Sequence, residues 1–349
     1  MAATTTALRR QIGSANDLQS VVRTMKASAA AAIGQYESSV AALAGYAQTV
    51  ERGLGVCLRS VAAPGAMAGS ESDGNGGRGS SGVSGGSQPV HAVVFGSDQG
   101  LVGRFNEDVV AHALAHLAHL APLAGTGGAR AEAVSASAGT TAGTTAGNSG
   151  SAARPVRAAA TRPARVWAVG QRVQARLLDA GLAPVDTFEV PGSVQLINGL
   201  VGQILQRVPW PEHPGGDEAT GASLLLFYNR PAGAGYEPVV QRLLPLDARW
   251  QHELAGRPWP TQALPEVLGS APQALRALVR EHLFVSLFRA SAESLASENA
   301  SRLAAMQRAE RNIGDMLAEL GAEFHRRRQS GIDEELFDVL AGFDAMAPQ

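Results

Sequence analysis

The two ends of this 349-residue chain share one pattern of apolar and polar positions. From about Thr4 to Arg59 there is no proline, and apolar or small residues recur every three or four positions. Between Pro272 and Phe343 there is again no proline, and the same spacing continues. This spacing is typical of a helix that packs against another helix along one face. We therefore predict one long helix in each terminal segment.

The expected contact positions can be read from the spacing. Those of the N-terminal helix are Leu8, Ile12, Ala15, Leu18, Val22, Met25, Ala29, Ala32, Tyr36, Val40, Leu43, Ala47, Val50 and Leu54, and those of the C-terminal helix run from Leu275 through His282, Phe288, Asn299, Met306 and Ile313 to Phe324. A helix of about 55 residues would be about 80 Å long and needs a partner along most of that length. We expect the two ends to pair as an antiparallel coiled coil, because the middle of the chain must return the second helix to the first.

The middle of the chain, about residues 90–247, alternates strand-like and helix-like stretches. "VHAVVFG", "RVWAVG", "VDTFEV" and "ASLLLFYNR" have the pattern of strands, and "YEPVVQRLLPL" that of an edge strand. The intervening "FNEDVVAHALAHLAHL", "QRVQARLLDAG" and "VQLINGLVGQILQRV" have the spacing of helices. This alternation predicts a small α/β layer. The predicted fold is therefore α/β, with a long antiparallel coiled coil and a small central domain.

Two biased stretches complete the expected domain organisation. Residues 61–89 are mostly Gly and Ser, and residues 124–163 are rich in Gly, Ala, Thr and Ser. Neither can bury enough apolar surface to offset the cost of ordering the chain, so we expect disordered loops. The predicted units are the N-terminal helix (1–60), the first loop, the central domain (90–247, with the second loop inserted), a connecting segment (248–271) and the C-terminal helix (272–349).

Composition narrows the function classes. The net charge is −2, so no bulk charge favours nucleic acid or an anionic membrane. Cys57 is the single cysteine, which excludes an internal disulfide and fits a reducing compartment. The N-terminus lacks the apolar core of a signal peptide, and no apolar run approaches the roughly 20 residues that span a bilayer. We expect a soluble, cytosolic chain.

A glycine-rich turn, "GSDQGLVGRFN", lies between the first predicted strand and helix of the central domain. Gly96, Gly100 and Gly103 raise the question of a phosphate site. A dinucleotide fingerprint needs G-x-G-x-x-G and an acidic residue about 20 positions on, and that spacing is missing. No Gly-Lys-Ser/Thr sequence occurs either. A structural turn, with Asp98 as a cap, is the favoured interpretation over a phosphate cradle.

Other candidate sites are also better explained by structure than by chemistry. His112, His116 and His119 share one helical face, but no HExxH motif or paired carboxylate accompanies them, which favours a partly solvated face over a metal site. Cys57 is expected to pack rather than to react. The basic "HRRRQ" at 325–329 is followed by acidic "DEELFD", a pattern that favours a charged protein partner over nucleic acid. We predict no metal and no cofactor.

Several segments, taken together, resemble the γ subunit of F-type ATP synthases. The N-terminal "ALRRQIGSANDLQSVVRTMKASAAAAI" is similar to the opening of that family, and "SDQGLVGRFN" resembles its "SDRGLCGGFN" turn. "LASENASRLAAMQRAERNIGDMLAEL" and "HRRRQSGIDEELFDVLAGFDA" resemble its C-terminal helix. The resemblance covers both ends and, in outline, the middle.

The resemblance implies a rotor without a catalytic site of its own. In this family the coiled coil turns inside a ring of α and β subunits, which hold the nucleotides. The central domain stands on an ε-type subunit and the membrane c-ring. The expected role is to couple ion flow to ATP synthesis or hydrolysis. The expected place is peripheral, at the cytoplasmic face of the bacterial inner membrane.

The resemblance also assigns subunit contacts by position. Met25 and Lys26 match a contact site on the N-terminal helix, and Arg302 matches a facing residue on the C-terminal helix. Arg328, Gln329 and Glu335 match polar contacts with a loop of the catalytic subunit. The alternative is that all of these are ordinary surface residues of a coiled coil.

Some positions depart from the family pattern. Asp333 stands where threonine is usual, Phe343 where alanine is usual and Arg104 where glycine is usual. With the two insertions, they favour a divergent γ, such as that of an accessory ATPase. Two other functions stay open at this point: a free-standing coiled-coil adaptor, and a dinucleotide-binding enzyme that uses the glycine turn.

Overall fold

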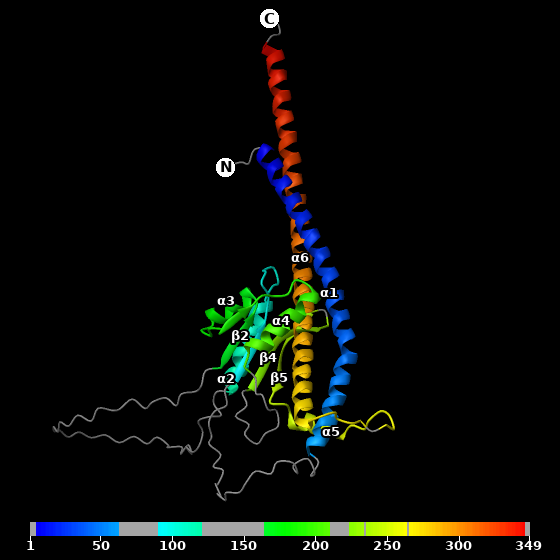
Figure 1. Cartoon of the computed structure of the whole chain (residues 1–349). Coiled ribbons are helices and arrows are strands. Elements are labelled where there is room, and N and C mark those ends of the chain that lie inside the picture. The colour runs from blue at the N-terminus through cyan, green and yellow to red at the C-terminus, as the bar shows by residue number, and fades with distance from the viewer. Residues whose placement is uncertain are drawn as a thin grey trace, which may run out of the picture.

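The computed structural model describes residues 5–62, 90–120, 164–209, 223–233, 235–263 and 265–345. Two helices from the chain ends dominate it: α1 spans Thr5–Ala62 and α6 spans Ala271–Ala345. They lie side by side for most of their length (Figure 1). With 58 and 75 residues they are about 87 and 112 Å long at 1.5 Å per residue. The predicted fold, an antiparallel coiled coil with a central α/β domain, is confirmed.

Cross-helix pairs establish the antiparallel direction. Arg23 near the start of α1 pairs with Glu310, and Tyr46 near its end donates a hydrogen bond to Glu281. Buried residues of α1 then recur every seven positions, at Leu8, Ala15, Val22, Ala29 and Tyr36. This is the period that keeps one stripe facing a partner in a left-handed coiled coil.

One predicted contact position on α1 is wrong. Leu18 is 52% exposed, whereas its neighbour Gln19 is half-buried. The physical reason is the strict seven-residue repeat from Ala15 to Val22, whose second contact position falls four residues after the first. Leu18 lies three residues after Ala15 and Gln19 lies four, and both spacings occur on one face of a helix. The prediction chose Leu18 because it is apolar, whereas the coil buries part of Gln19.

The central domain is built on a five-stranded sheet. Its elements in chain order are β1 (Val90–Phe95), α2 (Phe105–Leu120), β2 (Arg165–Val169), α3 (Gln171–Asp179), β3 (Asp186–Phe188), α4 (Val194–Arg207), β4 (Ser223–Ala232) and β5 (Gly235–Leu244). The strand order is β3-β2-β1-β4-β5. Neighbours from β3 to β4 are parallel, and β5 pairs antiparallel with β4. β5 is the edge strand that the sequence predicted.

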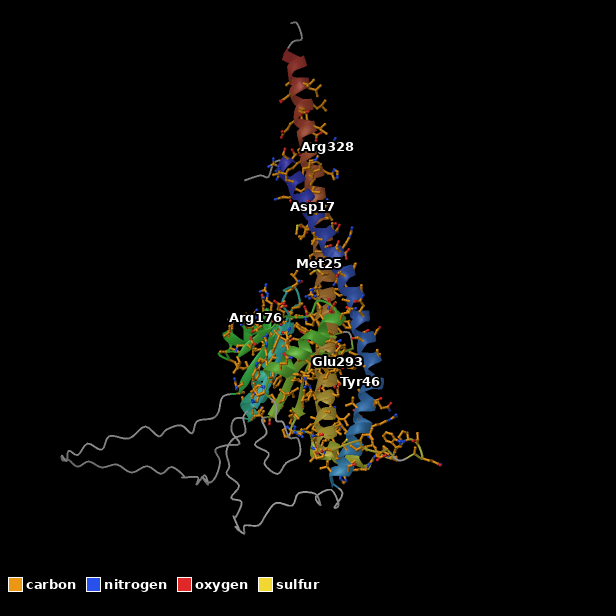
Figure 2. The ribbon with its side chains drawn as sticks, viewed as in Figure 1. Asp17, Met25, Tyr46, Arg176, Glu293 and Arg328 are labelled. Atoms are coloured by element: carbon orange, nitrogen blue, oxygen red, sulfur yellow. The ribbon has the colours of Figure 1, made fainter. Side chains whose placement is uncertain are left out.

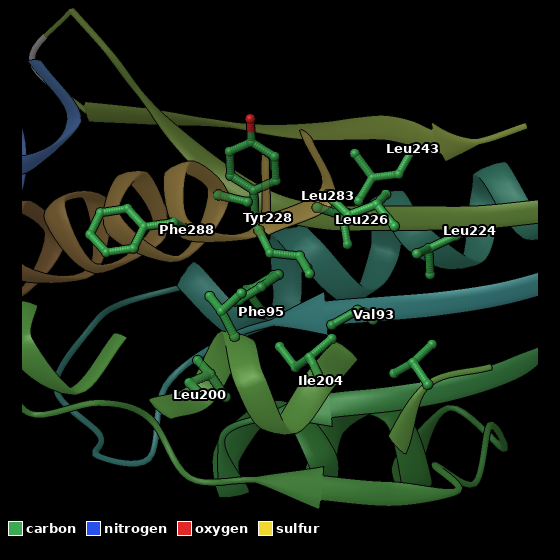
Figure 3. Close-up of a cluster of buried hydrophobic side chains, with 14 of the residues drawn as sticks. Val93, Phe95, Leu200, Ile204, Leu224, Leu226, Tyr228, Leu243, Leu283 and Phe288 are labelled. Carbon is green, nitrogen blue, oxygen red and sulfur yellow. The ribbon is translucent and has the colours of Figure 1, made fainter. Parts of the chain in front are cut away.

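Both faces of the sheet are covered. Val93 and Phe95 of β1 point to the side of α4 and α6, while Ala92 and Val94 point to the side of α2 and α3. Burial on both faces explains why the parallel strands are continuous apolar runs rather than alternating ones. The first face is continuous with the coil, because its core also contains Leu283 and Phe288 of α6 (Figure 3).

A helix that the sequence did not predict lies in the connecting segment. α5 spans Ala248–Gly256 and begins at Asp247, whose carboxylate accepts a hydrogen bond from the Arg249 N–H at 2.7 Å. It packs across the domain end of α1 (Figure 1). Arg59 of α1 donates to the carbonyls of Ala255 and Arg257, at 3.0 and 2.9 Å. α5 therefore fastens the end of α1.

The predicted disordered loops, apart from residues 61–62 at the end of α1, lie outside the described residues. Among the parts of the chain that the structure describes, no helix combines the length and apolarity needed to cross a bilayer.

Candidate functional site

The predicted contacts on α1 lie where the coil has left the central domain. Figure 2 shows Met25 at this level. Met25 is half-buried and packs on a small apolar cluster that includes Met306 and Ile313 of α6. Lys26 extends across the coil, with its Nζ 2.6 Å from a Glu310 carboxylate oxygen, and Arg23 reaches the other oxygen at 3.1 Å. These two hydrogen bonds, from Lys26 first, lower the pKa of Glu310.

Arg302 lies nearer the domain than Met25. Its guanidinium is 2.6 Å from the Glu298 carboxylate and 3.2 Å from the Asn299 side-chain oxygen, both on its own helix. The Arg302 and Glu298 side chains are only 13% and 6% exposed. Met25 packs on the cluster that contains Met306, one turn further along α6 than Arg302, and the assignment of Met25 and Arg302 to subunit contacts stays a prediction.

This ion pair forms part of the wall of a groove of about 290 Å³. Tyr36 of α1, Asp98 after β1 and Pro191 before α4 line it together with the pair. Burial raises the pKa of Glu298, and Asp98 adds to the rise, whereas Arg302 opposes it. The groove thus marks where the coil and the carboxyl ends of the parallel strands meet.

The remaining predicted contacts lie on the far end of α6. Arg328, Gln329 and Glu335 are all exposed, and Gln329 contacts Asp333 of the next turn at 3.5 Å. α6 projects here past the start of α1 (Figures 1 and 2). Every described side chain from Ile332 to Ala341 is exposed. The predicted contact residues therefore occupy three levels of the shaft and do not form one constellation.

Exposed apolar side chains accompany the charged ones on this tip. Ile332, Leu336, Phe337, Val339 and Leu340 are between 49% and 69% exposed. The sequence pattern placed this segment in the C-terminal helix but did not indicate how far the helix would extend beyond the start of α1. That distance depends on the register of the two helices, which the Arg23–Glu310 contact reveals in the structure.

The glycine turn is a packed structural element. A Cβ on Gly96 would lie 2.3 Å from the Val173 side chain and 2.6 Å from that of Asn106. Gly103 adopts a positive φ of 59°, which favours glycine. Asp98 accepts hydrogen bonds from the backbone N–H groups of Gln171 and Val190, at 2.8 and 2.9 Å. It therefore ties three loops together rather than capping only its own turn.

The turn is also fixed to the shaft. The Ser301 hydroxyl of α6 donates to the Val102 carbonyl at 2.5 Å. Ser97 and Asn106 hydrogen-bond each other at the base of the turn, at 3.0 and 2.9 Å. The space that a phosphate would need next to Gly96 is filled by protein atoms.

The histidine face of α2 is partly packed. The rings of His112 and His116 both make edge-to-face contacts with the ring of Phe227 of β4, with centroid distances of 6.3 and 5.7 Å. Burial lowers the pKa of His116. Among the described residues, no group of His, Cys, Asp and Glu side chains has the arrangement of a metal site. Cys57 is buried in the core, and burial raises the pKa of its thiol, as expected for a packing residue.

The chain forms a coiled shaft from its two ends, with a small α/β domain at one end and a single-helix tip at the other. This shape is typical of the stalk subunits of larger protein complexes. The family model described as ATP synthase matches residues 4–132 and 140–346. The chain therefore belongs to the ATP synthase γ-chain family.

Curated relatives align over part of their length. The ATP synthase gamma chain of Beijerinckia indica is 32% identical over 109 residues, which cover 31% of this chain and 36% of that one. The gamma chain of Desulforapulum autotrophicum is 34% identical over 118 residues, covering 32% and 40%. This chain thus matches well under half the length of these relatives.

Solved structures support the fold. The rotor of the Euglena gracilis mitochondrial ATP synthase in rotational state 1 aligns with a TM-score of 0.50 at 14% identity, covering 93% of this chain and 97% of that one. A structure of the same enzyme's OSCP/F1/c-ring in rotational state 3 gives 0.50 at 15% identity, covering 97% and 93%. At this identity the similarity concerns the fold.

Proposed function

We propose that this chain is the central-stalk rotor of an ion-translocating ATP synthase or ATPase. In this role it couples ion flow through a membrane ring to the conformational cycle of catalytic α and β subunits. The nucleotides and the chemistry belong to those subunits. The chain's own contribution is mechanical, and it depends on a stiff shaft with different faces at different levels.

The exposed tip of α6 is the observation that carries this proposal. It exposes Arg328, Gln329 and Glu335 together with apolar side chains such as Phe337. A single helix of this length is marginally stable in water without a partner. An exposed apolar stripe on such a helix marks a protein contact. A surrounding sleeve of subunits would supply that contact and would also meet the polar side chains.

The lower contacts fit the same role. Lys26 and Arg23 present positive charge around Glu310 on the outer side of the coil, and Arg302 is held in place by Glu298. We propose that Met25, Lys26 and Arg302 face the base of the sleeve and that the tip residues face its interior. An ε-type subunit and the c-ring would bind the domain end, which places the chain peripherally at the cytoplasmic face of the bacterial inner membrane.

Reconstitution tests the proposal directly. The purified chain is mixed with α and β subunits of the same organism, and assembly and the ATPase rate are measured with and without it. One copy per three αβ pairs and a faster ATPase support the rotor. Failure to associate with the α and β subunits would refute it.

The same preparation separates the alternatives. A coiled-coil adaptor would self-associate stably and would not need ATPase subunits. A dinucleotide-binding enzyme would bind a nucleotide in isolation, and substitution of Gly96 would abolish that binding.

A further inference from the structure

The turn between β1 and α2 contains an unusual backbone conformation. Leu101 has a φ of 64°, and among the described residues it is the one residue other than glycine with a positive φ. A residue with a Cβ is strained in this left-handed conformation, whereas glycine adopts it freely. Leu101 is also 60% exposed, so burial of its side chain does not offset the strain. Contacts elsewhere in the turn must therefore hold Leu101 in this conformation.

The residues that follow Leu101 are held from two sides. The Ser301 hydroxyl of α6 donates to the carbonyl of the buried Val102 at 2.5 Å. The Phe105 N–H, at the start of α2, points to the same carbonyl at 3.4 Å. Asn229 of β4 is fully buried and donates to the Phe105 carbonyl at 2.8 Å. The shaft and the sheet thus fix this half of the turn together.

The residues that precede Leu101 are fixed as well. Asp98 accepts hydrogen bonds from two backbone N–H groups of the neighbouring loops, and the Ser97 hydroxyl donates to the Gln99 carbonyl at 2.9 Å. A strained residue persists only where the surrounding structure constrains it from several directions, and such residues cluster at functional sites. The conformation of Leu101 therefore points to a role for its exposed side chain.

The position of the turn indicates what that side chain would meet. The turn lies at the end of the domain from which the long helices emerge (Figure 1). Ser301 directly precedes Arg302, which the proposed function places at the base of the sleeve. Asp98 and Gln99 of the turn line the same groove as Arg302. A subunit that surrounds the shaft would therefore first meet the central domain at this level.

We propose that Leu101 is a contact residue for the base of the α/β sleeve and that Ser301 is the positioning residue that holds the turn for this contact. The proposal rests on the rotor function proposed above. A glycine at position 101 would form the turn without strain, so the leucine is explained by what its side chain contacts. Because Ser301 belongs to the shaft, the contact follows the movement of α6 directly.

Four variants of the full chain separate the two roles. Ser301→Ala removes the hydrogen bond to the turn, and Ser301→Thr keeps a hydroxyl at that position. Ser297→Ala is the matched control, because Ser297 lies one turn earlier on α6 and its buried hydroxyl has no hydrogen-bond partner among the described residues. Leu101→Gly removes the proposed contact and the backbone strain together.

Hydrogen exchange of the isolated chain, followed by mass spectrometry over residues 97–105, reports on the turn. Loss of one neutral hydrogen bond should speed exchange in Ser301→Ala by about 2- to 12-fold, the equivalent of about 0.5–1.5 kcal/mol. Exchange should stay parental in Ser297→Ala and Ser301→Thr. The unfolding midpoint of Leu101→Gly should not fall below the parental one, because the strain is removed.

The complex reconstituted with α and β subunits reports on the contact. The concentration of chain that gives half-maximal ATPase stimulation should rise about 10-fold in Leu101→Gly, the equivalent of about 1.4 kcal/mol for the lost burial of a leucine side chain. It should rise less in Ser301→Ala and stay parental in Ser301→Thr and Ser297→Ala. A purely structural role of Leu101 predicts a change in stability without a change in stimulation.

Parental ATPase stimulation by Leu101→Gly would overturn the contact role. Unchanged exchange in Ser301→Ala, or an equal change in Ser297→Ala, would overturn the positioning role. Failure of the rotor proposal has another signature: the parental chain itself would neither assemble with the α and β subunits nor raise their ATPase rate.

Discussion

Gly55 lets α1 cross α5 at very short distance. A Cβ at this position would lie 2.6 Å from the carbonyl oxygen of Leu254 and 3.3 Å from its carbonyl carbon. Both are backbone atoms of α5, so rotation of a side chain cannot relieve the clash. Carbon–oxygen contacts begin near 3.3 Å, so Gly55→Ala requires the two helices to separate by about 0.7 Å.

Two opposing effects set the size of the change. Alanine in a helix interior is favoured over glycine by about 1 kcal/mol. Overpacking a fixed contact costs about 1–3 kcal/mol. The separation also lengthens the hydrogen bonds from Arg59 to the last carbonyls of α5, which are charge-assisted and contribute more than neutral ones. The overpacking cost less the propensity gain leaves about 0–2 kcal/mol, and the longer Arg59 hydrogen bonds add to this loss. We therefore expect Gly55→Ala to lower the free energy of unfolding by about 1–2 kcal/mol.

Gly45→Ala is the matched control. Gly45 lies on the same helix, is exposed, and has nothing within 4 Å of the position of an added Cβ. It should show the helix-propensity gain alone, about 1 kcal/mol. Chemical denaturation of both variants, followed by helical circular dichroism, gives the difference. If Gly55→Ala stabilised the chain as much as Gly45→Ala, the close crossing of α1 and α5 would be refuted.

Three further predictions concern charge. Burial lowers the pKa of His282, with Glu51 opposing, so the unfolded chain takes up a proton first and stability should fall as pH drops below about 6.5. His282→Phe should reduce that dependence in denaturation midpoints without removing it, because burial also lowers the pKa of His91 and of His116; an unchanged dependence would contradict the role of His282. Met25→Lys should leave ATP hydrolysis in place but lower the number of ions moved per ATP, because it adds a positive charge beside Lys26 and Arg23, which already bind Glu310. Thr24→Lys, on the exposed side of α1, is the control. Equal ion pumping in the two variants would contradict the assignment of Met25 to a subunit contact. Arg328→Gln should weaken ATPase stimulation without changing the unfolding midpoint of the isolated chain, since the side chain is exposed.

The sequence predicted the coiled coil because a helical repeat of apolar residues that continues this far without proline fits few structures other than two long paired helices. It also predicted the strands, since sheets buried on both faces leave continuous apolar runs such as "VHAVVF". It did not predict α5, which buries only Leu254 and therefore shows no apolar face, whereas the equally short α3 buries Val173 and Leu177 four residues apart. The start signal of α5, Asp247, is a common loop residue as well as a helix cap.

The candidate site was predictable only in part. The family resemblance assigns Lys26 of α1 and Arg302 of α6 to subunit contacts, but it does not reveal which residues lie across the coil from them. The pairing of Glu310 with Lys26 depends on the register of the two helices, which the sequence alone does not give. Glu298 gave no signal, because a carboxylate four residues before an arginine is also common on exposed helices.

The division of the apolar cores sets how the molecule comes apart. One continuous core joins the sheet, α4, α5 and the domain end of the coil, whereas the outer coil has a separate, smaller cluster built on the buried residues Ala15, Val22, Met306 and Ile313. Cooperative units follow such clusters. The domain and the adjoining half of the coil should therefore unfold as a single block, and the outer coil should fray first. The shaft is thus a firm base that carries a compliant end.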